Sequence, residues 1–459
     1  MEIDKQLLDK YDVPVPRYTS YPPANHFKDS FTEASWLELV EASNHEDPSH
    51  IGFYIHIPFC RRICFYCGCN AHAMKSSSVV EDYFKALEAE IHTVIEHIDK
   101  NRKVSQIHYG GGTPNAVDVN FLARINEIFF KQFRFIENPE IAIECHPAHL
   151  DYEYVNNLVK AGFNRISLGI QDFNPEILKG VNRLPSALPV DQLVQHLRSY
   201  ASPLSVNLDF IYGLPGQTVE SFTKTIQQAI DIRPDRLVTF SYAHVPWLKQ
   251  HQQILERKGL PDASHKMEMF LASRALLENS GYLSLGLDHY VLPQDELYQA
   301  IENNQLHRNF QGYCTRRTTG QVYAFGVSAI SQLSSAYMQN TKELNHYIRK
   351  INEGSLAVEK GHLLTPEQKV TGAVITQLMC NLNLDINAMA LQFGLSMDSF
   401  KAVTGFNESK LESFMDDGLI DYRDNNLKVN RKGALFIRNI AAAFDPTYTA
   451  QINKYSKSV

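Results

Sequence analysis

Short apolar runs alternate with amphipathic segments through the first half of the chain. The runs that predict strands cover residues 51–57, 104–109, 141–145, 165–170, 206–212 and 236–242. Segments with apolar residues at helical spacing lie between them, at 80–99, 120–133, 152–161, about 186–200 and 218–232. Strands and helices that alternate in this way predict a parallel sheet with right-handed crossovers.

Small or polar residues occur at or just after the end of each predicted strand. In chain order they are Cys60, Gly110, Glu144, Gln171, Asp209 and Ala243. The carboxyl ends of parallel strands meet at one rim, and β/α barrels carry their active sites at that rim. The number of strands alone does not separate a partial barrel from a doubly wound sheet, but the position of these residues favours a barrel-type rim.

The two ends of the chain have a different character. Residues 1–48 lack a clear period and are rich in proline, so we expect an arm that lies over a larger body. Near the other end, helices are expected at 366–378, 386–393, 408–417 and 433–444. A hairpin with its turn at 423–426 precedes the last of these helices. Helices combined with a hairpin are typical of a winged-helix-like module.

We therefore predict an α/β protein with four parts. Residues 1–48 form an N-terminal arm or lid, and residues 49–290 form the barrel domain. Residues 291–364 form a connecting segment that completes the active site. Residues 365–459 form a mainly helical, winged-helix-like domain.

The composition is that of an ordinary soluble globular protein. Of the 459 residues, 44% are hydrophobic and 21% are charged. The net charge of −7 argues against nucleic-acid binding by the chain as a whole. No stretch has the ~18 consecutive apolar residues of a membrane span, and the N-terminus does not resemble a signal sequence. Seven cysteines, clustered towards one end, indicate reduced, cytoplasmic chemistry.

Three cysteines lie close together at Cys60, Cys64 and Cys67. Their spacing fits neither one helix face nor one strand face, so we expect a loop around a bound group. Thiolates favour iron–sulfur clusters or zinc, and a closed zinc site needs four ligands. The trio therefore predicts a 4Fe–4S cluster with one iron left open. Zinc, with Cys69, His56 or His72 as fourth ligand, is the alternative, and three thiols without function are a weaker one.

Two further features mark the rim. The glycine loop, residues 110–113, follows a strand, and glycines let backbone groups approach a ligand closely. Glu144 ends an apolar strand, where a carboxylate suits ribose hydroxyls or an ammonium group. The structural alternatives are a plain turn at residues 110–113 and an ion pair at Glu144.

The cysteine spacing resembles the cluster motif of the radical S-adenosylmethionine (SAM) enzymes. The wider string from His56 to Asn70, including Cys69, resembles the oxygen-independent coproporphyrinogen III oxidases of haem synthesis. The resemblance implies a partial (β/α)6 barrel and a SAM-dependent oxidoreductase. The implied reaction is anaerobic oxidative decarboxylation of two propionates of coproporphyrinogen III to vinyl groups, which gives protoporphyrinogen IX.

The resemblance also implies that two SAM molecules bind side by side. The residues that match the cluster-bound SAM are Tyr54, Gly111, Glu144 and Ile330. Those that match the second SAM are Tyr66, Gly112, Thr113, Gln171, Arg183, Asp209 and Ala243. Tyr54 and Cys69 are the candidate catalytic residues. Cys69 lies too close to Cys67 to bind the same cubane easily, so it faces the second SAM or the substrate, or is simply a small residue beside the cluster.

A tetrapyrrole substrate with four propionates requires arginine or lysine partners. The candidates are Arg17, Arg308, Arg316 and Arg317, with Tyr313 for stacking or hydrogen bonding. A low-potential donor such as flavodoxin or ferredoxin is the expected electron source, and we expect a monomer. The chain departs from the usual family strings at 145–148 and at 314–317, and both departures bear on which tetrapyrrole is the substrate.

Three rival functions remain open. Two come from the same wider group: a radical SAM methyltransferase or ring-opening enzyme acting on haem, and a haem chaperone that keeps the cluster. The third is a DNA-binding regulator that uses the C-terminal module. Acidic residues where a recognition helix would lie, including Glu408, Glu412, Asp416 and Asp417, count against DNA binding.

Overall fold

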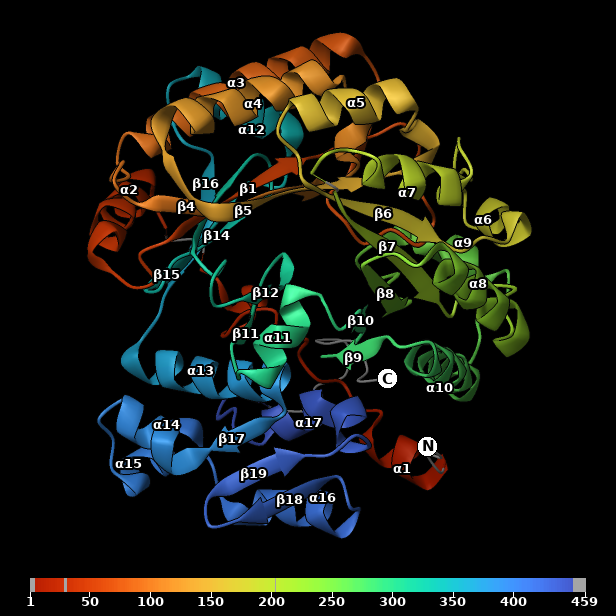
Figure 1. Cartoon of the computed structure of the whole chain (residues 1–459). Helices are drawn as coiled ribbons and strands as arrows, with labels where there is room; N and C mark the ends of the chain where they lie inside the picture. Colours follow the sequence, from red (N-terminus) through yellow and green to blue (C-terminus); the bar gives the residue numbers. More distant parts are fainter. Residues whose placement is uncertain (1–4, 29–30, 203, 449–459) are drawn as a thin grey trace.

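A curved, twelve-stranded sheet dominates the computed structural model, which describes residues 5–28, 31–202 and 204–448 (Figure 1). Six parallel strands form its centre: β1 (Ile51–Ile57), β4 (Lys103–Gly111), β5 (Arg134–Cys145), β6 (Arg165–Gln171), β7 (Ser205–Tyr212) and β8 (Arg236–Ser241). They are neighbours in chain order, as the partial barrel requires. The predicted six-unit α/β fold is confirmed.

Helices cover the convex side of this sheet (Figure 1). They are α3 (Ser77–Ile95), α4 (Val119–Gln132), α5 (Tyr152–Lys160), α6 (Pro175–Gly180), α7 (Val190–Arg198), α8 (Val219–Ile232) and, beyond the short α9 (Gln253–Glu256), α10 (Ala263–Asn279). The strand face that packs against these helices is apolar, and the regular recurrence of its apolar residues is what the sequence pattern identified. The six-residue α6 was missed because it offers less than two turns of periodicity.

The sheet extends beyond the six units at both edges. At one edge β13 (Gln321–Phe325) pairs in parallel with β1, followed by β14 (Ile330–Gln332), β15 (Ala336–Asn340) and β16 (Val358–Leu363). At the other edge lie β10 (His289–Val291) and β9 (Leu283–Leu285). Part of the segment 291–364, expected as a connection, thus continues the main sheet. Its remaining elements are α11 (Glu296–Glu302), the hairpin β11 (Leu306–Asn309) and β12 (Gly312–Thr315), and α12 (Leu344–Asn352).

A buried carboxylate joins the added strands to the barrel. Glu90 of α3 accepts hydrogen bonds from the Gly326 amide at 2.8 Å and the Tyr347 hydroxyl at 2.6 Å. Asn340 on β15 also donates to Glu90. Burial raises the pKa of Glu90 to about 6 despite these donors. One side chain therefore links α3, the end of β13, β15 and α12.

Residues 1–48 lack a clear period in the sequence, yet they include regular helices. They contain α1 (Lys5–Tyr11) and α2 (Glu33–Ala42). The two helices belong to different cores, because Trp36 of α2 packs in the barrel core, whereas Tyr11 of α1 packs in the C-terminal domain. The arm therefore bridges both parts of the molecule.

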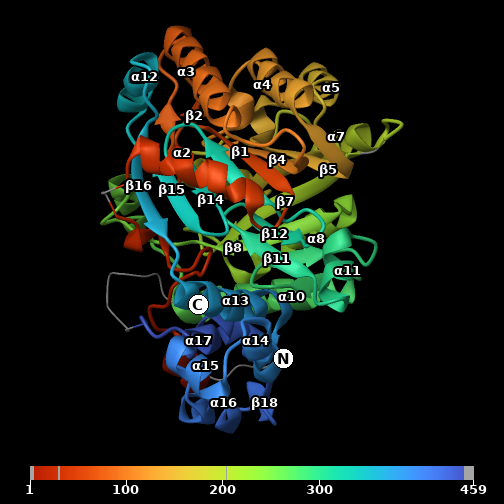
Figure 2. The same cartoon turned by 90° about the vertical axis from the view of Figure 1, so that its left-hand side faces the viewer.

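The C-terminal domain forms a separate lobe below the sheet in both views (Figures 1 and 2). Its helices are α13 (Pro366–Asn381), α14 (Ile386–Gln392), α15 (Met397–Thr404), α16 (Glu412–Asp416) and α17 (Ile437–Ala442), and its strands are β17 (Asn383–Asp385), β18 (Ile420–Arg423) and β19 (Asn426–Val429). Asp424 and Asn425 have φ of 50° and 61°, as a two-residue hairpin turn requires. The predicted winged-helix-like character is present, with β17 and α15 added.

The arm is fixed to this lobe by one buried carboxylate. Tyr18 and Tyr21 donate hydrogen bonds to Asp445 at 3.0 and 2.9 Å, and all three residues are buried.

No described helix combines the length and apolar character needed to cross a membrane.

We predict that Asp445→Ala lowers the free energy of unfolding by about 2–4 kcal/mol, because two buried hydroxyls lose a charged acceptor. Urea denaturation of the purified protein measures this change. Asp421→Ala, which removes an exposed carboxylate paired with Arg423, is the matched control and should change stability by less than about 0.5 kcal/mol. Equal effects of the two substitutions would show that Asp445 does not fix the arm.

Candidate active site

The cysteine loop leaves the sheet at the carboxyl end of β1. Its base is closed by two short parallel strands, β2 (Phe59–Cys60) and β3 (His72–Ala73). Cys60 and Cys64 are buried, Cys67 is half-buried and Cys69 is exposed. The loop therefore presents its thiols between the barrel rim and the molecular surface.

The thiols differ in how readily they ionise. A hydrogen bond from the Cys69 thiol lowers the pKa of Cys67 to about 6, with help from the charges of Lys249 and His251. Burial raises the pKa of Cys60 to about 11, although the Thr113 hydroxyl lies 3.2 Å from its sulfur. A bound metal cluster supplies the positive charge that lets such a thiol ionise.

The described donors do not form a closed zinc site. Tetrahedral zinc, with Zn–S of about 2.3 Å, brings its sulfurs within about 4 Å of each other. Across the described residues, no three His, Cys, Asp or Glu side chains are gathered for a single metal ion. In a cubane each thiolate binds a different iron, so wider spacing is expected. His56 is also engaged, because it donates to the Asn70 carbonyl at 3.0 Å and contacts the Tyr54 hydroxyl at 3.1 Å.

The glycine loop packs directly beneath the cysteine loop. The amides of Gly112 and Thr113 donate to the carbonyls of Ile57 and Phe59 at 2.8 and 2.9 Å. A Cβ on Gly111, where φ is 115°, would lie 2.5 Å from the His56 ring. A Cβ on Gly112 would lie 2.8 Å from the Pro58 carbonyl. Packing alone therefore requires these two glycines, independently of any role in ligand binding.

Glu144 is held at the rim by β4 as well as by its own strand. His108 Nε2 donates to its carboxylate at 3.1 Å, and the Gly111 amide donates as well. Burial raises the pKa of Glu144, but these hydrogen bonds outweigh burial and the net pKa lies below its ordinary value. The side-chain partner of Glu144 is thus a histidine and not a lysine or arginine, and the carboxylate is an ionised acceptor at the rim.

Asp209 occupies the equivalent place on β7. It accepts hydrogen bonds from Ser167 and Asn207, both at 2.7 Å. Burial raises the pKa of Asp209 to about 6, and the charge of Glu144 adds to the effect. Two carboxylates with different proton affinities therefore lie on the same rim.

Unpaired polar atoms lie beside the cysteine loop. Arg183 donates to the Tyr66 hydroxyl at 2.9 Å and to the Gly169 carbonyl, and it lies 3.5 Å from the Cys64 sulfur. Its Nε, and the side-chain oxygen of Gln171, are buried without a hydrogen-bond partner among the described residues. Gln171 also adopts a φ of 71°. These orphaned groups fit a position where a polar ligand is bound.

The segment after β8 holds the cysteine loop from outside, which the sequence did not reveal. Lys249 donates to the Cys69 carbonyl at 2.7 Å and His251 to the Cys67 carbonyl at 2.8 Å. Gln252 donates to the carbonyls of Tyr66 and Ala243 at 2.9 and 3.4 Å. Because the acceptors are backbone carbonyls, the side chains of the cysteine loop give no indication of these contacts in the sequence.

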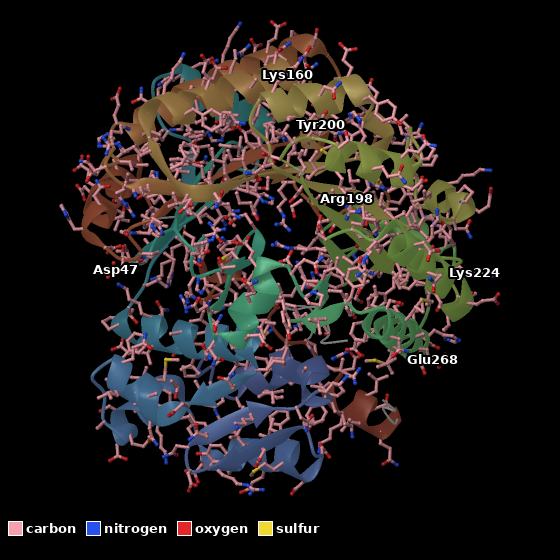
Figure 3. All side chains as sticks on the ribbon, viewed as in Figure 1. Asp47, Lys160, Arg198, Tyr200, Lys224 and Glu268 are labelled. Atoms are coloured by element: carbon pink, nitrogen blue, oxygen red, sulfur yellow. The ribbon has the colours of Figure 1, made fainter. Side chains whose placement is uncertain are left out.

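A cavity of about 520 Å³ lies on the concave side of the sheet. Figure 3 shows side chains of the central strands that point towards this side. Cys69, Glu144 and Asp209 line it from the rim. Arg17, Arg308 and Tyr313 line it from the arm and the hairpin. The structure therefore brings rim residues and two of the predicted substrate arginines to one space.

Other candidates lie elsewhere. Arg316 lines a separate cavity of about 460 Å³ between the hairpin and α13. Arg317 forms an ion pair with Glu296 at 2.6 Å and donates to the Asn138 carbonyl, near the amino end of β5. Ile330 begins β14 and does not line the 520 Å³ cavity.

The two departures from the family strings are accommodated structurally. His146 accepts a hydrogen bond from the Ala148 amide at 3.1 Å, and its own amide donates to Asn115 at 2.8 Å. Burial lowers the pKa of His146 to about 2, so the ring is neutral. Cys314 is buried next to the Thr319 hydroxyl and does not line the 520 Å³ cavity. Neither residue faces that cavity.

Comparison with known proteins agrees with this geometry. The family model of the radical SAM superfamily matches residues 54–229, and that of the HemN C-terminal domain matches residues 364–436. The oxygen-independent coproporphyrinogen III oxidase of Synechocystis sp. is 36% identical over 99% of this chain and 97% of its own length. That of Escherichia coli K12 is 38% identical over 98% and 96%.

A solved structure extends the similarity to three dimensions. Coproporphyrinogen III oxidase (HemN) from Escherichia coli, described as a radical SAM enzyme, superimposes with a TM-score of 0.89 at 35% identity. The match covers 98% of this chain and 100% of that one. The similarity therefore spans the arm, the barrel and the C-terminal lobe together. The chain belongs to the oxygen-independent coproporphyrinogen III oxidase family of the radical SAM superfamily.

Proposed function

We propose that the chain catalyses the oxygen-independent oxidative decarboxylation of two propionates of coproporphyrinogen III to vinyl groups. The observation that carries this proposal is the shared cavity, which has Cys69 of the cysteine loop on one side and Arg17 and Arg308 on the other. A cavity that has the cysteine loop on one side and arginines on the other suits a substrate with several carboxylates. The names of the relatives support the same reaction.

Cys60, Cys64 and Cys67 would hold a 4Fe–4S cluster. When bound, the cluster and SAM supply the 5′-deoxyadenosyl radical that takes a hydrogen atom from the propionate β-carbon. The bond to the carboxylate carbon then breaks, carbon dioxide leaves, one electron passes to an external one-electron acceptor, and a vinyl group remains. The chain must bind, orient and shield these groups from water.

The rim residues suit two SAM molecules. Glu144, ionised and held by His108, would accept hydrogen bonds from the ammonium or ribose of the cluster-bound SAM, beside Tyr54, Gly111 and Ile330. The orphaned Arg183 Nε and Gln171 oxygen support a second SAM, as does Asp209. Tyr66, Gly112, Thr113 and Ala243 complete the second set.

A group of three arginines would recognise substrate carboxylates. Arg17, Arg308 and Arg438 line one small cavity of about 110 Å³, together with one carboxylate, Asp288. Arg308 Nε is buried without a hydrogen-bond partner among the described residues. Burial and the charges of Arg17 and Arg308 lower the pKa of Arg438 to about 9. A propionate bound here would offset this positive charge.

Arg438 also connects substrate binding to the arm. It donates hydrogen bonds to the carbonyls of Val15 and Pro16, the two residues before Arg17. The C-terminal lobe thereby positions the arm residue that faces the cavity. This supports a role for the lobe in forming the substrate site.

The decisive experiment is anaerobic incubation of the reconstituted protein with coproporphyrinogen III, SAM and a low-potential reductant. We expect protoporphyrinogen IX, carbon dioxide and 5′-deoxyadenosine, and no product from Cys67→Ala, which loses a cluster ligand. Cys380→Ala, which alters a buried thiol in α13, should keep its iron and its activity. Methylated or opened haem, or stable haem binding without turnover, would instead support one of the rival functions.

Asp209 should make binding of the second SAM depend on pH. Because burial raises its pKa to about 6, the ionised fraction falls about tenfold between pH 7 and pH 5. We expect the affinity for the second SAM, measured by calorimetry, to weaken about tenfold over this range. In Asp209→Asn the affinity should already be weak at pH 7 and independent of pH. An unchanged pH profile in this variant would exclude Asp209 as the acceptor.

The same shift predicts an effect on stability. A carboxyl whose pKa is raised in the folded state destabilises the fold above that pKa, and this penalty disappears as the pH falls towards the unfolded-state pKa near 4. Asp209→Asn should therefore raise the melting temperature at pH 8 more than at pH 4.5. This comparison separates a folding effect from loss of SAM binding.

Arg308→Gln should raise the KM for coproporphyrinogen about tenfold or more, because a charge-assisted hydrogen bond is worth about 1.5–3 kcal/mol. SAM cleavage without substrate should stay within twofold of the wild-type rate. Arg316→Gln removes an arginine that does not line the 520 Å³ cavity and is the matched control. A larger KM effect at Arg316 than at Arg308 would move the carboxylate site to the other side of the hairpin.

A further inference from the structure

The surface around the cysteine loop is basic, although the whole chain has a net charge of −7. Three segments form it: residues 60–75, 175–184 and 244–258. Their exposed basic residues are Arg61, Arg62, Lys75, Lys179, Arg257 and Lys258, and their exposed acidic residues are Glu176 and Glu256. We call these three segments the loop surface. Its charge is opposite in sign to that of the chain as a whole.

Hydrogen bonds join the three segments into one surface. The Phe65 amide donates to the Val181 carbonyl at 3.0 Å. Lys258 donates to the Gly180 carbonyl at 2.6 Å and lies 5.8 Å from the centre of the Phe65 ring. The contacts from Lys249, His251 and Gln252 to the cysteine loop, described above, complete the connection. The charges therefore belong to one built surface that includes the cysteine loop.

Apolar side chains are exposed on the same surface. Trp247 is 53% exposed and Leu248 is 71% exposed. Leu184 and Ile254 are also exposed, so the loop surface holds four of the nine exposed large hydrophobic residues in the described part of the chain. Aromatic and aliphatic residues with a polar, charged rim are typical of protein-docking surfaces.

We propose that the loop surface docks an acidic protein that carries one electron at a time. The inference rests on the proposed function, which requires a cluster at Cys60, Cys64 and Cys67 that accepts an electron for each SAM cleavage. The carrier is oxidised by one electron and the cluster is reduced by one, and no bond or proton is exchanged. The cavity on the concave side is reserved for the substrate, so the electron enters from the outer side of the cysteine loop.

The charge distribution favours this partner. A negatively charged chain repels acidic proteins in most orientations, and a local basic surface gives the encounter its direction. Electron-transfer complexes are small and short-lived, below about 1,200 Å² of buried area. Trp247 and Leu248 provide a limited apolar contact, and Arg62 lies between two cluster ligands in the sequence. The loop surface is thus next to the cluster that accepts the electron.

The test compares Arg62→Glu, Lys179→Glu and the double variant with Lys428→Glu, a matched charge reversal. Lys428 is exposed on β19 in the C-terminal lobe, whereas α6 and α9 of the loop surface lie at the edge of the barrel (Figure 1). Stopped-flow spectroscopy measures the second-order rate of cluster reduction by reduced flavodoxin, an acidic one-electron carrier. Calorimetry measures the affinity of the same pair without turnover.

At low ionic strength we expect each single reversal to slow reduction at least threefold and the double variant at least tenfold. Lys428→Glu should stay within a factor of 1.5 of the wild type. The differences should disappear at about 1 M salt, because exposed charges are then screened beyond about 3 Å. Trp247→Ala should weaken the affinity measured by calorimetry at every salt concentration.

Excess dithionite must reduce the same amount of cluster in every variant, which shows that the cluster itself is intact. Equal flavodoxin rates in the loop-surface variants and the wild type would overturn the docking surface alone. So would an equal loss of rate in Lys428→Glu, because net charge would then explain it. A wild-type protein that forms no reducible cluster would overturn the proposed function together with this inference.

Discussion

The contact on which the site depends is the backbone pairing of the glycine loop with the cysteine loop. Gly112 and Thr113 donate to the carbonyls of Ile57 and Phe59, and this contact fixes the exit of the cysteine loop from β1. The chains approach so closely that a Cβ at Gly111 or Gly112 would collide with its neighbours. Both loops leave adjacent parallel strands, so the sheet sets their separation before any ligand binds. Preorganisation of this kind lowers the entropic cost of ordering a cofactor site.

The open side of the barrel gives the concave face its polar character. A closed barrel of eight strands fills its interior with apolar side chains. Here the interior carries Glu144 and Asp209 near the rim, and Glu140 with Arg165 near the amino ends, where their ion pair measures 2.8 Å. The hairpin and the arm cover this side instead of two further units. An incomplete barrel thus provides a polar space whose remaining wall is supplied by segments that carry arginines.

The sequence predicted the elements whose signals are local. Strands such as β1 and β7 carry apolar residues on the face that packs against helices, and this periodicity is visible in the sequence. The cysteine spacing can be recognised without knowledge of the fold. The position of β13 beside β1 could not be predicted, since the two strands are far apart in the chain and β13 is short. The structure of the arm was missed because α1 is ordered by packing in the C-terminal lobe. Arg316 and Arg317 follow the end of β12 at Thr315 and do not line the 520 Å³ cavity, which their closeness to Tyr313 in the sequence did not indicate.

The cysteine loop has an inner face towards the cavity and an outer face towards solvent. Cys69 is exposed and also lines the cavity. The inner face borders the 520 Å³ cavity, which in the proposed function holds SAM and substrate and keeps the radical from water. The outer face is held by Lys249, His251 and Gln252 through backbone carbonyls of the loop, and by the Phe65 amide, which donates to the Val181 carbonyl. If electrons enter on the outer side, the carrier does not need access to the cavity at each turnover. The arm, linked to the C-terminal lobe through Arg438 and Asp445, contributes Arg17 to the wall of the same cavity.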